Sequence, residues 1–265
     1  MMLQPLFYGL IILGYVISTF GYCLQVIFND RGLGKIAFWV LLVGVVFQTA
    51  LLVLQHLPPF HYFNHGEGDF YFAVSWLLGI GFLGIRQVRT WNFGIFLVPL
   101  AAILMIMAMS HPLAYHVGDK MSSNPWALIH FLFMSIAFAV FSVSFILGIS
   151  FLLQRSALKS RNPGWISQYL PPLEVADEIH AKASTLGFLV LSAGMISGAI
   201  LSKQTLGLFF TGDPRQIMAL LVWLVYAIFL NVRLRSGWRG RKSILLALLG
   251  FLVVILAFLG IQHRI

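Results

Sequence analysis

Long apolar stretches separated by short polar segments run along the whole chain. An α-helix needs about 20 apolar residues to cross the hydrocarbon core of a bilayer, and the apolar blocks have this length. We expect eight transmembrane helices, at approximately residues 5–28, 36–56, 69–85, 92–110, 126–153, 184–202, 216–232 and 243–262. The first block is expected to be a true span and not a cleaved signal peptide. The pattern predicts an all-α integral membrane protein, a bundle of about eight transmembrane helices that forms a single polytopic membrane domain over residues 1–265.

The composition supports an integral membrane protein that lies in the lipid bilayer. Hydrophobic residues make up 60% of the 265 residues and charged residues 9%, whereas soluble domains contain about 25% charged residues. Cys23 is the only cysteine. A disulfide within the chain, a Cys-pair redox centre and a C-x-x-C-H motif for covalent haem attachment are therefore excluded.

The distribution of basic residues predicts the orientation. Thirteen of the 17 Lys and Arg residues lie in the segments after the first, third, fifth and seventh spans, and only Lys120, Lys203, Arg215 and Arg264 lie on the other side. Basic loops face the cytoplasm, so we expect both termini on the outer, non-cytoplasmic side. This asymmetry accounts for the formal charge of +9, and no nucleic acid partner is needed to explain it.

The histidines follow the opposite pattern. His180 is the one expected on the cytoplasmic side, and the other seven lie on or near the outer side: His56, His61, His65, His111, His116, His130 and His263. Neutral imidazoles are not needed for topology. Their concentration on one side is the first functional signal in the chain.

His130 and His263 are the pair with the clearest chemistry. His130 lies about one turn inside the fifth span, and His263 directly follows the eighth, so both are expected at one membrane depth. Two neutral imidazoles on opposite faces of a porphyrin would form a bis-histidine haem site. Spacing alone favours two ordinary interfacial histidines, each satisfied by a neighbour, because histidines at helix ends are common.

Other polar or small residues favour structural roles. His61 and His65 have zinc-like i, i+4 spacing, but prolines and glycines around them favour a loop. Gly194 and Gly198 form a small-xxx-small face for close helix packing. Asp213 before Pro214 predicts the capped start of a helix. A further set, expected on a short exposed cytoplasmic helix with no acid–base role, comprises Glu174, Asp177 and Glu178.

The last third of the chain carries more specific motifs. "LGFLVLSAGMISGAI", an aromatic outer loop "LGLFFTGDP" and "DPRQIMALLVWLVYAIFLNVR" follow one another, and the chain also contains "LIHFLFMSIAF" and "GIQH". Over residues 184–265 this resembles the cytochrome c assembly family, the group of CcsA-, ResC- and HemX-like haem-handling membrane proteins. Members have a tryptophan-rich outer loop that ends in Trp-Asp-Pro and a following span that reads Trp-Leu-x-Tyr-Ala.

The resemblance implies a site. The axial ligands of the haem iron would be His130 and His263, the haem would be b-type and bound non-covalently and transiently, and Phe209, Phe210 and Trp126 would line the pocket. Asp213 would fix the loop by capping the seventh span.

Two positions depart from the family pattern. Phe209 and Phe210 stand where members have tryptophans, and Asn231 stands where synthase members have a membrane-embedded histidine. An inner, transmembrane haem site is therefore not expected, and the chain resembles the HemX-like branch.

These implications define the functional hypotheses. The first is a haem-binding protein of cytochrome c maturation in the inner (plasma) membrane, which presents haem at the outer face to another assembly membrane protein or to apocytochrome c. The alternative is a HemX-like membrane regulator or scaffold of tetrapyrrole biosynthesis, which docks its partner through residues 165–182. A transporter is disfavoured because the spans hold almost no charges. An assembly factor fits better than a self-contained enzyme, since no bond-making residue stands out.

Overall fold

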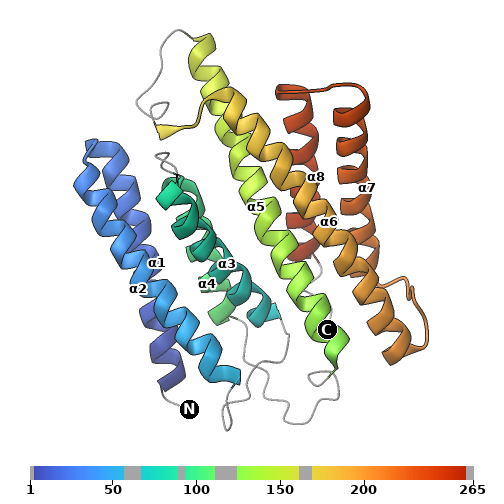
Figure 1. Ribbon diagram of the computed structural model, residues 1–265. Coiled ribbons are helices and arrows are strands. Elements are labelled where there is room, and N and C mark those ends of the chain that lie inside the picture. The colour runs from blue at the N-terminus through green and yellow to red at the C-terminus, as the bar shows by residue number, and fades with distance from the viewer. Residues whose placement is uncertain (1–2, 57–66, 89–92, 111–123, 161–168, 261–265) are drawn as a thin grey trace. The chain divides into compact units, whose positions relative to one another are not determined.

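The described part of the chain is entirely helical. The computed structural model describes residues 3–56, 67–88, 93–110, 124–160 and 169–260, and these contain no β-strand. Figure 1 shows the eight helices, which are α1 (Leu3–Phe28), α2 (Arg31–His56), α3 (Glu67–Val88), α4 (Gly94–Ser110), α5 (Pro125–Lys159), α6 (Leu173–Leu206), α7 (Pro214–Arg235) and α8 (Arg241–Gly260). The all-α class predicted from the apolar blocks is confirmed.

Within the residues that the structure describes, five helices are long and apolar enough, by length and composition, to cross a membrane: α1, α2, α5, α6 and α7. Helix α4 is a shorter apolar helix of 17 residues. Most helix boundaries agree with the predicted spans to within a few residues. The exceptions are the end of α5, the start of α6 and the start of α2, where polar sequence continues the helix beyond the apolar block.

Helix α6 corrects one prediction. It is a single helix of 34 residues, so the short surface helix expected before the sixth span is instead the first part of that span's helix. At 1.5 Å per residue it is about 50 Å long, well beyond the roughly 30 Å of a hydrocarbon core. Residues 173–183 therefore extend the helix with a more polar segment.

Helices α1–α4 form one compact unit. Within it, α1 packs on α2 and α4, and α3 packs on α4 and α2. Its interior contains a buried polar link: the Tyr15 hydroxyl donates to Gln48 Oε1 at 2.6 Å, and Gln48 Nε2 donates to the Phe72 carbonyl at 3.1 Å. Buried polar groups need such partners, so this link joins α1, α2 and α3.

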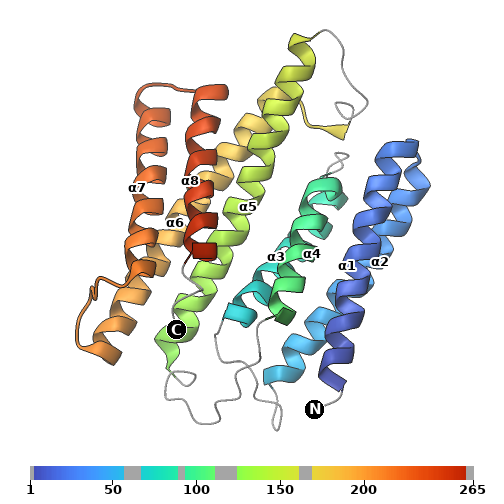
Figure 2. The ribbon, with the colours of Figure 1, turned by 180° about the vertical axis from the view of Figure 1, so that it is seen from behind.

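Helices α5–α8 form the second unit. Helix α5 packs on α6 and α8, and α7 packs on α8 and α6. Figure 2 shows that successive helices alternate in direction. The aromatic core includes Phe141 and Tyr226, whose rings stack with centroids 4.0 Å apart, and Phe251, which packs on Phe138.

Alternating helices bring distant parts of the sequence to the two ends of the second unit. Helix α5 begins, α6 ends and α7 begins at one end, which we call the His130 end. Helix α5 ends, α6 begins and α7 joins α8 at the other, which we call the Arg233 end.

Candidate functional site

His130 is held by a hydrogen bond across two helices. Its Nδ1 atom lies 2.8 Å from the carbonyl oxygen of Gly194 on α6. A carbonyl only accepts, so Nδ1 must carry the hydrogen, and the neutral ring then has a lone pair on Nε2. The side chain is half-buried, and no hydrogen bond to Nε2 is found within the described ranges. The Nε2 atom of His130 is therefore held in one orientation, with a lone pair that can accept a hydrogen bond or bind a metal.

Two glycines on α6 make room for this arrangement. A Cβ atom on Gly198 would lie 2.8 Å from both Cε1 and Nδ1 of His130, and one on Gly194 would lie 3.0 Å from Met134 Sδ. Real Cβ atoms essentially never approach another atom within 3.0 Å. The small-xxx-small face therefore packs on α5 as predicted, and Gly198 also provides the space for the His130 ring.

The start of α5 is tied to the end of α6. Asn124 caps α5, because its Oδ1 accepts from the backbone N–H of Trp126 at 2.9 Å. Asn124 Nδ2 also donates to Gln204 Oε1 at 3.2 Å. Trp126 is half-buried in the first turn of α5. These contacts fix Trp126 about one turn from His130.

The α6–α7 loop exposes two aromatic rings. Phe209 and Phe210 are 60% and 56% exposed. Gly207, with φ of 78°, ends α6 in a left-handed conformation, and Lys203 Nζ donates to its carbonyl at 2.7 Å. The Lys203 ammonium also lies 5.3 Å from the centroid of the Phe209 ring. The loop thus holds an aromatic surface at the His130 end.

Asp213 closes this loop as the sequence predicts. Its Oδ1 accepts from the backbone N–H of Arg215 at 2.7 Å, and Pro214 is the first residue of α7. An N-cap of this kind contributes about 1 kcal/mol to helix stability. Asp213 therefore has a structural role that is independent of any ligand.

The structure unites part of the predicted site. His130, Trp126, Phe209, Phe210 and Asp213 share the His130 end, although no ring contact joins His130 to either phenylalanine in the described part of the chain. His263 lies outside the described residues, as do His61, His65, His111 and His116. Helix α8 runs toward the His130 end and is described as far as Gly260. The pairing of His263 with His130 stays a prediction.

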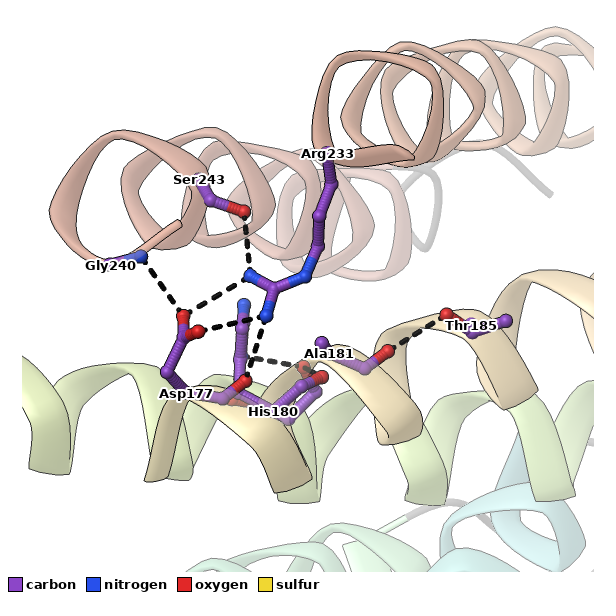
Figure 3. A network of polar contacts seen from close by, with 8 residues as sticks. Asp177, His180, Ala181, Thr185, Arg233, Gly240 and Ser243 are labelled. Atoms are coloured by element: carbon purple, nitrogen blue, oxygen red, sulfur yellow. Dashed lines mark hydrogen bonds and ion pairs between the residues drawn. The ribbon is translucent and has the colours of Figure 1, made fainter. Parts of the chain in front are cut away.

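A different polar cluster lies at the Arg233 end (Figure 3). Asp177 on α6 accepts from Arg233 Nη2 at 2.8 Å and Nη1 at 3.1 Å, and from the backbone N–H of Gly240 at 3.1 Å. Arg233 Nη1 also donates to Ser243 Oγ at 3.1 Å. The side chains of Asp177 and Arg233 are each 14% exposed. This Asp177–Arg233 network joins α6, α7 and α8.

The network overturns the exposed role predicted for Asp177. The sequence predicted that Asp177 lies with Glu174 and Glu178 on an exposed helix surface. Only Glu174 and Glu178 are exposed, and Glu178 forms a surface ion pair with Lys182. The prediction was wrong because the face of a polar helical turn that meets a neighbour depends on the packing of the next helices.

His180 was set aside by sequence reasoning, yet it is fully buried. Its Nδ1 donates to the Ser144 carbonyl at 2.9 Å, and Ser144 Oγ lies 2.7 Å from Ser184 Oγ. Its Nε2 has no hydrogen-bond partner in the described part of the chain, and its ring meets the edge of Phe229. Two serines within apolar helices were the sequence signal for this cluster.

Among the described residues there is no group of three or more His, Cys, Asp or Glu side chains that could hold a metal ion. Asn231, which replaces the inner histidine of the resembled family, is exposed on α7. It therefore does not face the interior of the second unit.

Comparison with known proteins identifies the family of the chain. The profile of the family described as Cytochrome C assembly protein matches residues 66–264. The chain is similar to the cytochrome c biogenesis protein CcsA of Prochlorococcus marinus strain NATL1A, with 41% identity over 89 residues that span 34% of this chain and 28% of the relative. CcsA of Chlamydomonas reinhardtii is 35% identical over 137 residues, 52% of this chain and 38% of that protein.

A more distant relative matches this chain over nearly the whole length of both proteins. CcsA of Prochlorococcus marinus strain MIT 9312 is 24% identical over 286 aligned residues, which cover 96% of this chain and 90% of the relative. No solved structure matches the chain. The chain therefore belongs to the cytochrome c assembly protein family, and its long apolar helices make it a multi-pass membrane protein.

Proposed function

We propose that the protein binds haem at the His130 end and presents it to a partner during cytochrome c maturation. The observation that carries this proposal is the hydrogen bond from His130 Nδ1 to the Gly194 carbonyl. Histidines that bind a metal through one nitrogen almost always donate the other N–H to a carbonyl or carboxylate, which fixes the tautomer and the ring orientation. The hydrogen bond from Nδ1 and the available Nε2 atom therefore suit His130 to bind haem iron.

His263 is the proposed second axial ligand. The topology supports this pairing, because α8 runs toward the end of the unit where α5 begins. Haem iron supplies a metal centre that two imidazoles can saturate. The two imidazoles of this chain would hold and orient the group.

The aromatic side chains would cover the porphyrin. Phe209 and Phe210 offer exposed rings on the α6–α7 loop, and Trp126 lies one turn before His130. Burying these rings against an apolar ligand removes them from water at about 25 cal/mol per Å² of apolar surface. The cap formed by Asp213 would hold the loop in place. The single Cys23 leaves non-covalent, b-type binding as the mode that the chain itself can support.

The proposed setting follows the relatives and the charge pattern. We place the protein in the inner (plasma) membrane with both termini outside the cytoplasm, as one membrane domain that passes haem to another cytochrome c assembly membrane protein or to apocytochrome c. The relatives' printed name, cytochrome c biogenesis protein, supports this role. In this role the protein acts as an assembly factor, and it needs no bond-making residue of its own.

The regulatory alternative relied on an acidic cytoplasmic docking segment. Asp177 is occupied by Arg233, and Glu178 is paired with Lys182. The acidic surface left for a partner is therefore smaller than the sequence suggested, which favours the haem-handling role.

A visible absorption spectrum of the purified full-length protein, loaded with haem, tests the proposal. Two imidazole ligands should give a six-coordinate, low-spin spectrum. His130→Ala and His263→Ala should each weaken binding and shift the iron away from low spin, and added imidazole should partly restore the spectrum. His65→Ala and His116→Ala are the matched controls and should change little. A wild-type protein that cannot be loaded, or an unchanged spectrum after loss of His130 or His263, would refute the ligand assignment.

A further inference from the structure

A cluster of basic residues surrounds the connection between α7 and α8, residues 234–242, which we call the α7–α8 loop. Its cations Arg235, Arg239, Arg241 and Lys242 are all exposed. The chain contains no Asp or Glu after Asp213. None of the four cations forms an ion pair with any residue that the structure describes. Their charge is therefore available to a ligand from outside the chain.

The loop is anchored at both ends. Asp177 accepts hydrogen bonds from Arg233, in the last turn of α7, and from the backbone N–H of Gly240, just before α8. Figure 3 shows both contacts converging on this one carboxylate. Gly237 and Gly240, with φ of 65° and 67°, allow the chain to turn between them. The cations thus project from a short connection whose two ends are tied together, and binding them costs less ordering entropy than binding a free tail.

Apolar side chains accompany the cations. Leu234 is 81% exposed and Trp238 is 42% exposed. The ammonium of Lys242 lies 5.5 Å from the centroid of the Trp238 ring. Tryptophan is enriched where a membrane meets water, because one part of its ring is apolar and the N–H is polar. The loop combines this anchor with a row of positive charges.

Position along the chain decides which partner fits. Helix α7 is a candidate membrane span, and Arg235 is its last residue. Arg241 and Lys242 open the next apolar helix. The cations therefore lie where the apolar helices end, and a bilayer crossed by α7 would bring lipid phosphates to the same level. A nucleic acid or an acidic protein would neutralise the charges but leave Leu234 and Trp238 facing water.

We propose that the α7–α8 loop, residues 234–242, binds the headgroups of anionic phospholipids. The guanidinium groups of Arg235 and Arg239 pair with phosphate oxygens, which suits their fork of N–H donors. Leu234 and Trp238 lie against the adjoining acyl region. This role is independent of haem binding at the opposite end of the unit.

The test compares two charge-matched variants of the full-length protein in detergent. Arg235→Gln/Arg239→Gln removes two exposed cations from the loop, and Arg155→Gln/Lys159→Gln removes two exposed cations from the end of α5, also at the Arg233 end. The probes are dioctanoyl phosphatidylglycerol, dioctanoyl phosphatidylcholine and inorganic phosphate, with binding followed by native mass spectrometry. A basic residue near an anionic surface contributes about a fivefold gain in affinity.

Wild-type protein should prefer phosphatidylglycerol to phosphatidylcholine, and the loop variant, which lacks two cations, should lose about 25-fold in affinity for phosphatidylglycerol. The α5 variant should stay within about twofold of wild type. Equal losses in both variants would show a diffuse charge effect and overturn the proposal. Displacement of the lipid by millimolar phosphate, or by polyglutamate at equal charge, would also overturn it, by pointing to a free anion or an acidic protein. Unaltered binding in the loop variant would do the same.

Discussion

Replacing Asp177 by alanine is the sharpest test of how the second unit is held together. The change removes the carboxylate that accepts two hydrogen bonds from Arg233 and one from Gly240. Arg233 would remain with a side chain only 14% exposed. Its remaining acceptors would both be neutral: Ser243 Oγ, which accepts from Nη1 at 3.1 Å, and the backbone carbonyl of residue 177, which accepts from Nη2 at 3.4 Å. Removing one partner of a buried ion pair costs about 3–5 kcal/mol because the other charge is left uncompensated. Partial exposure allows some hydration, so we expect a loss near about 3 kcal/mol.

The assay is equilibrium unfolding of the haem-free protein in mixed micelles, titrated with sodium dodecyl sulfate and followed by circular dichroism. Glu178→Ala is the matched control, because Glu178 is the next residue on the same helix and pairs with Lys182 where the two side chains are 63% and 74% exposed. Exposed i, i+4 pairs contribute about 0.3–0.5 kcal/mol. The double variant Asp177→Ala/Arg233→Met should lose less stability than the sum of the two single variants, since it leaves no buried charge. If Asp177→Ala unfolds like Glu178→Ala, the network does not stabilise the unit and the reasoning fails.

Two further predictions concern the His130 end and the membrane orientation. Gly198→Ala places a methyl group 2.8 Å from the His130 ring, so the ring must rotate or α6 must shift, and the protein should bind haem about tenfold more weakly and show a less low-spin absorption spectrum. Gly81→Ala, with nothing within 4 Å of the new Cβ, is the control and should bind haem as wild type does. Equal spectra in both variants would contradict the positioning role of Gly198. Reporter fusions after residue 238 should mark the cytoplasmic side and fusions at residue 210 the outer side, and the reverse pattern would overturn the predicted topology.

The sequence alone determined the helices. Each span is a local property, because a run of apolar residues of membrane length must satisfy its backbone hydrogen bonds internally and therefore forms a helix wherever it lies. Helix caps are local as well: Asp213 followed by Pro214 predicted the start of α7, and the structure has that cap. The motif of residues 124–138 likewise placed His130 correctly within the start of α5.

Contacts between helices were decided only by the tertiary structure. The sequence identified His130 as a candidate ligand, but the carbonyl that orients its ring belongs to Gly194, 64 residues away. The sequence predicted only a general packing role for Gly198, and the structure shows that the side chain beside it is the His130 imidazole. Spacing along one helix cannot report which residue of another helix lies opposite, since that depends on the rotation and depth of both.

The polar residues of α6 show the same division most clearly. Glu174, Asp177 and Glu178 lie within five residues and have the same charge, so composition treats them alike. Successive residues on a helix point about 100° apart, so Asp177 faces α7 and α8 while Glu178 faces outward. His180 is buried for the same reason, beside two serines from α5 and α6. The sequence determined that this segment is helical and polar, and only the packing of the neighbouring helices decided which of its charges would be buried and paired.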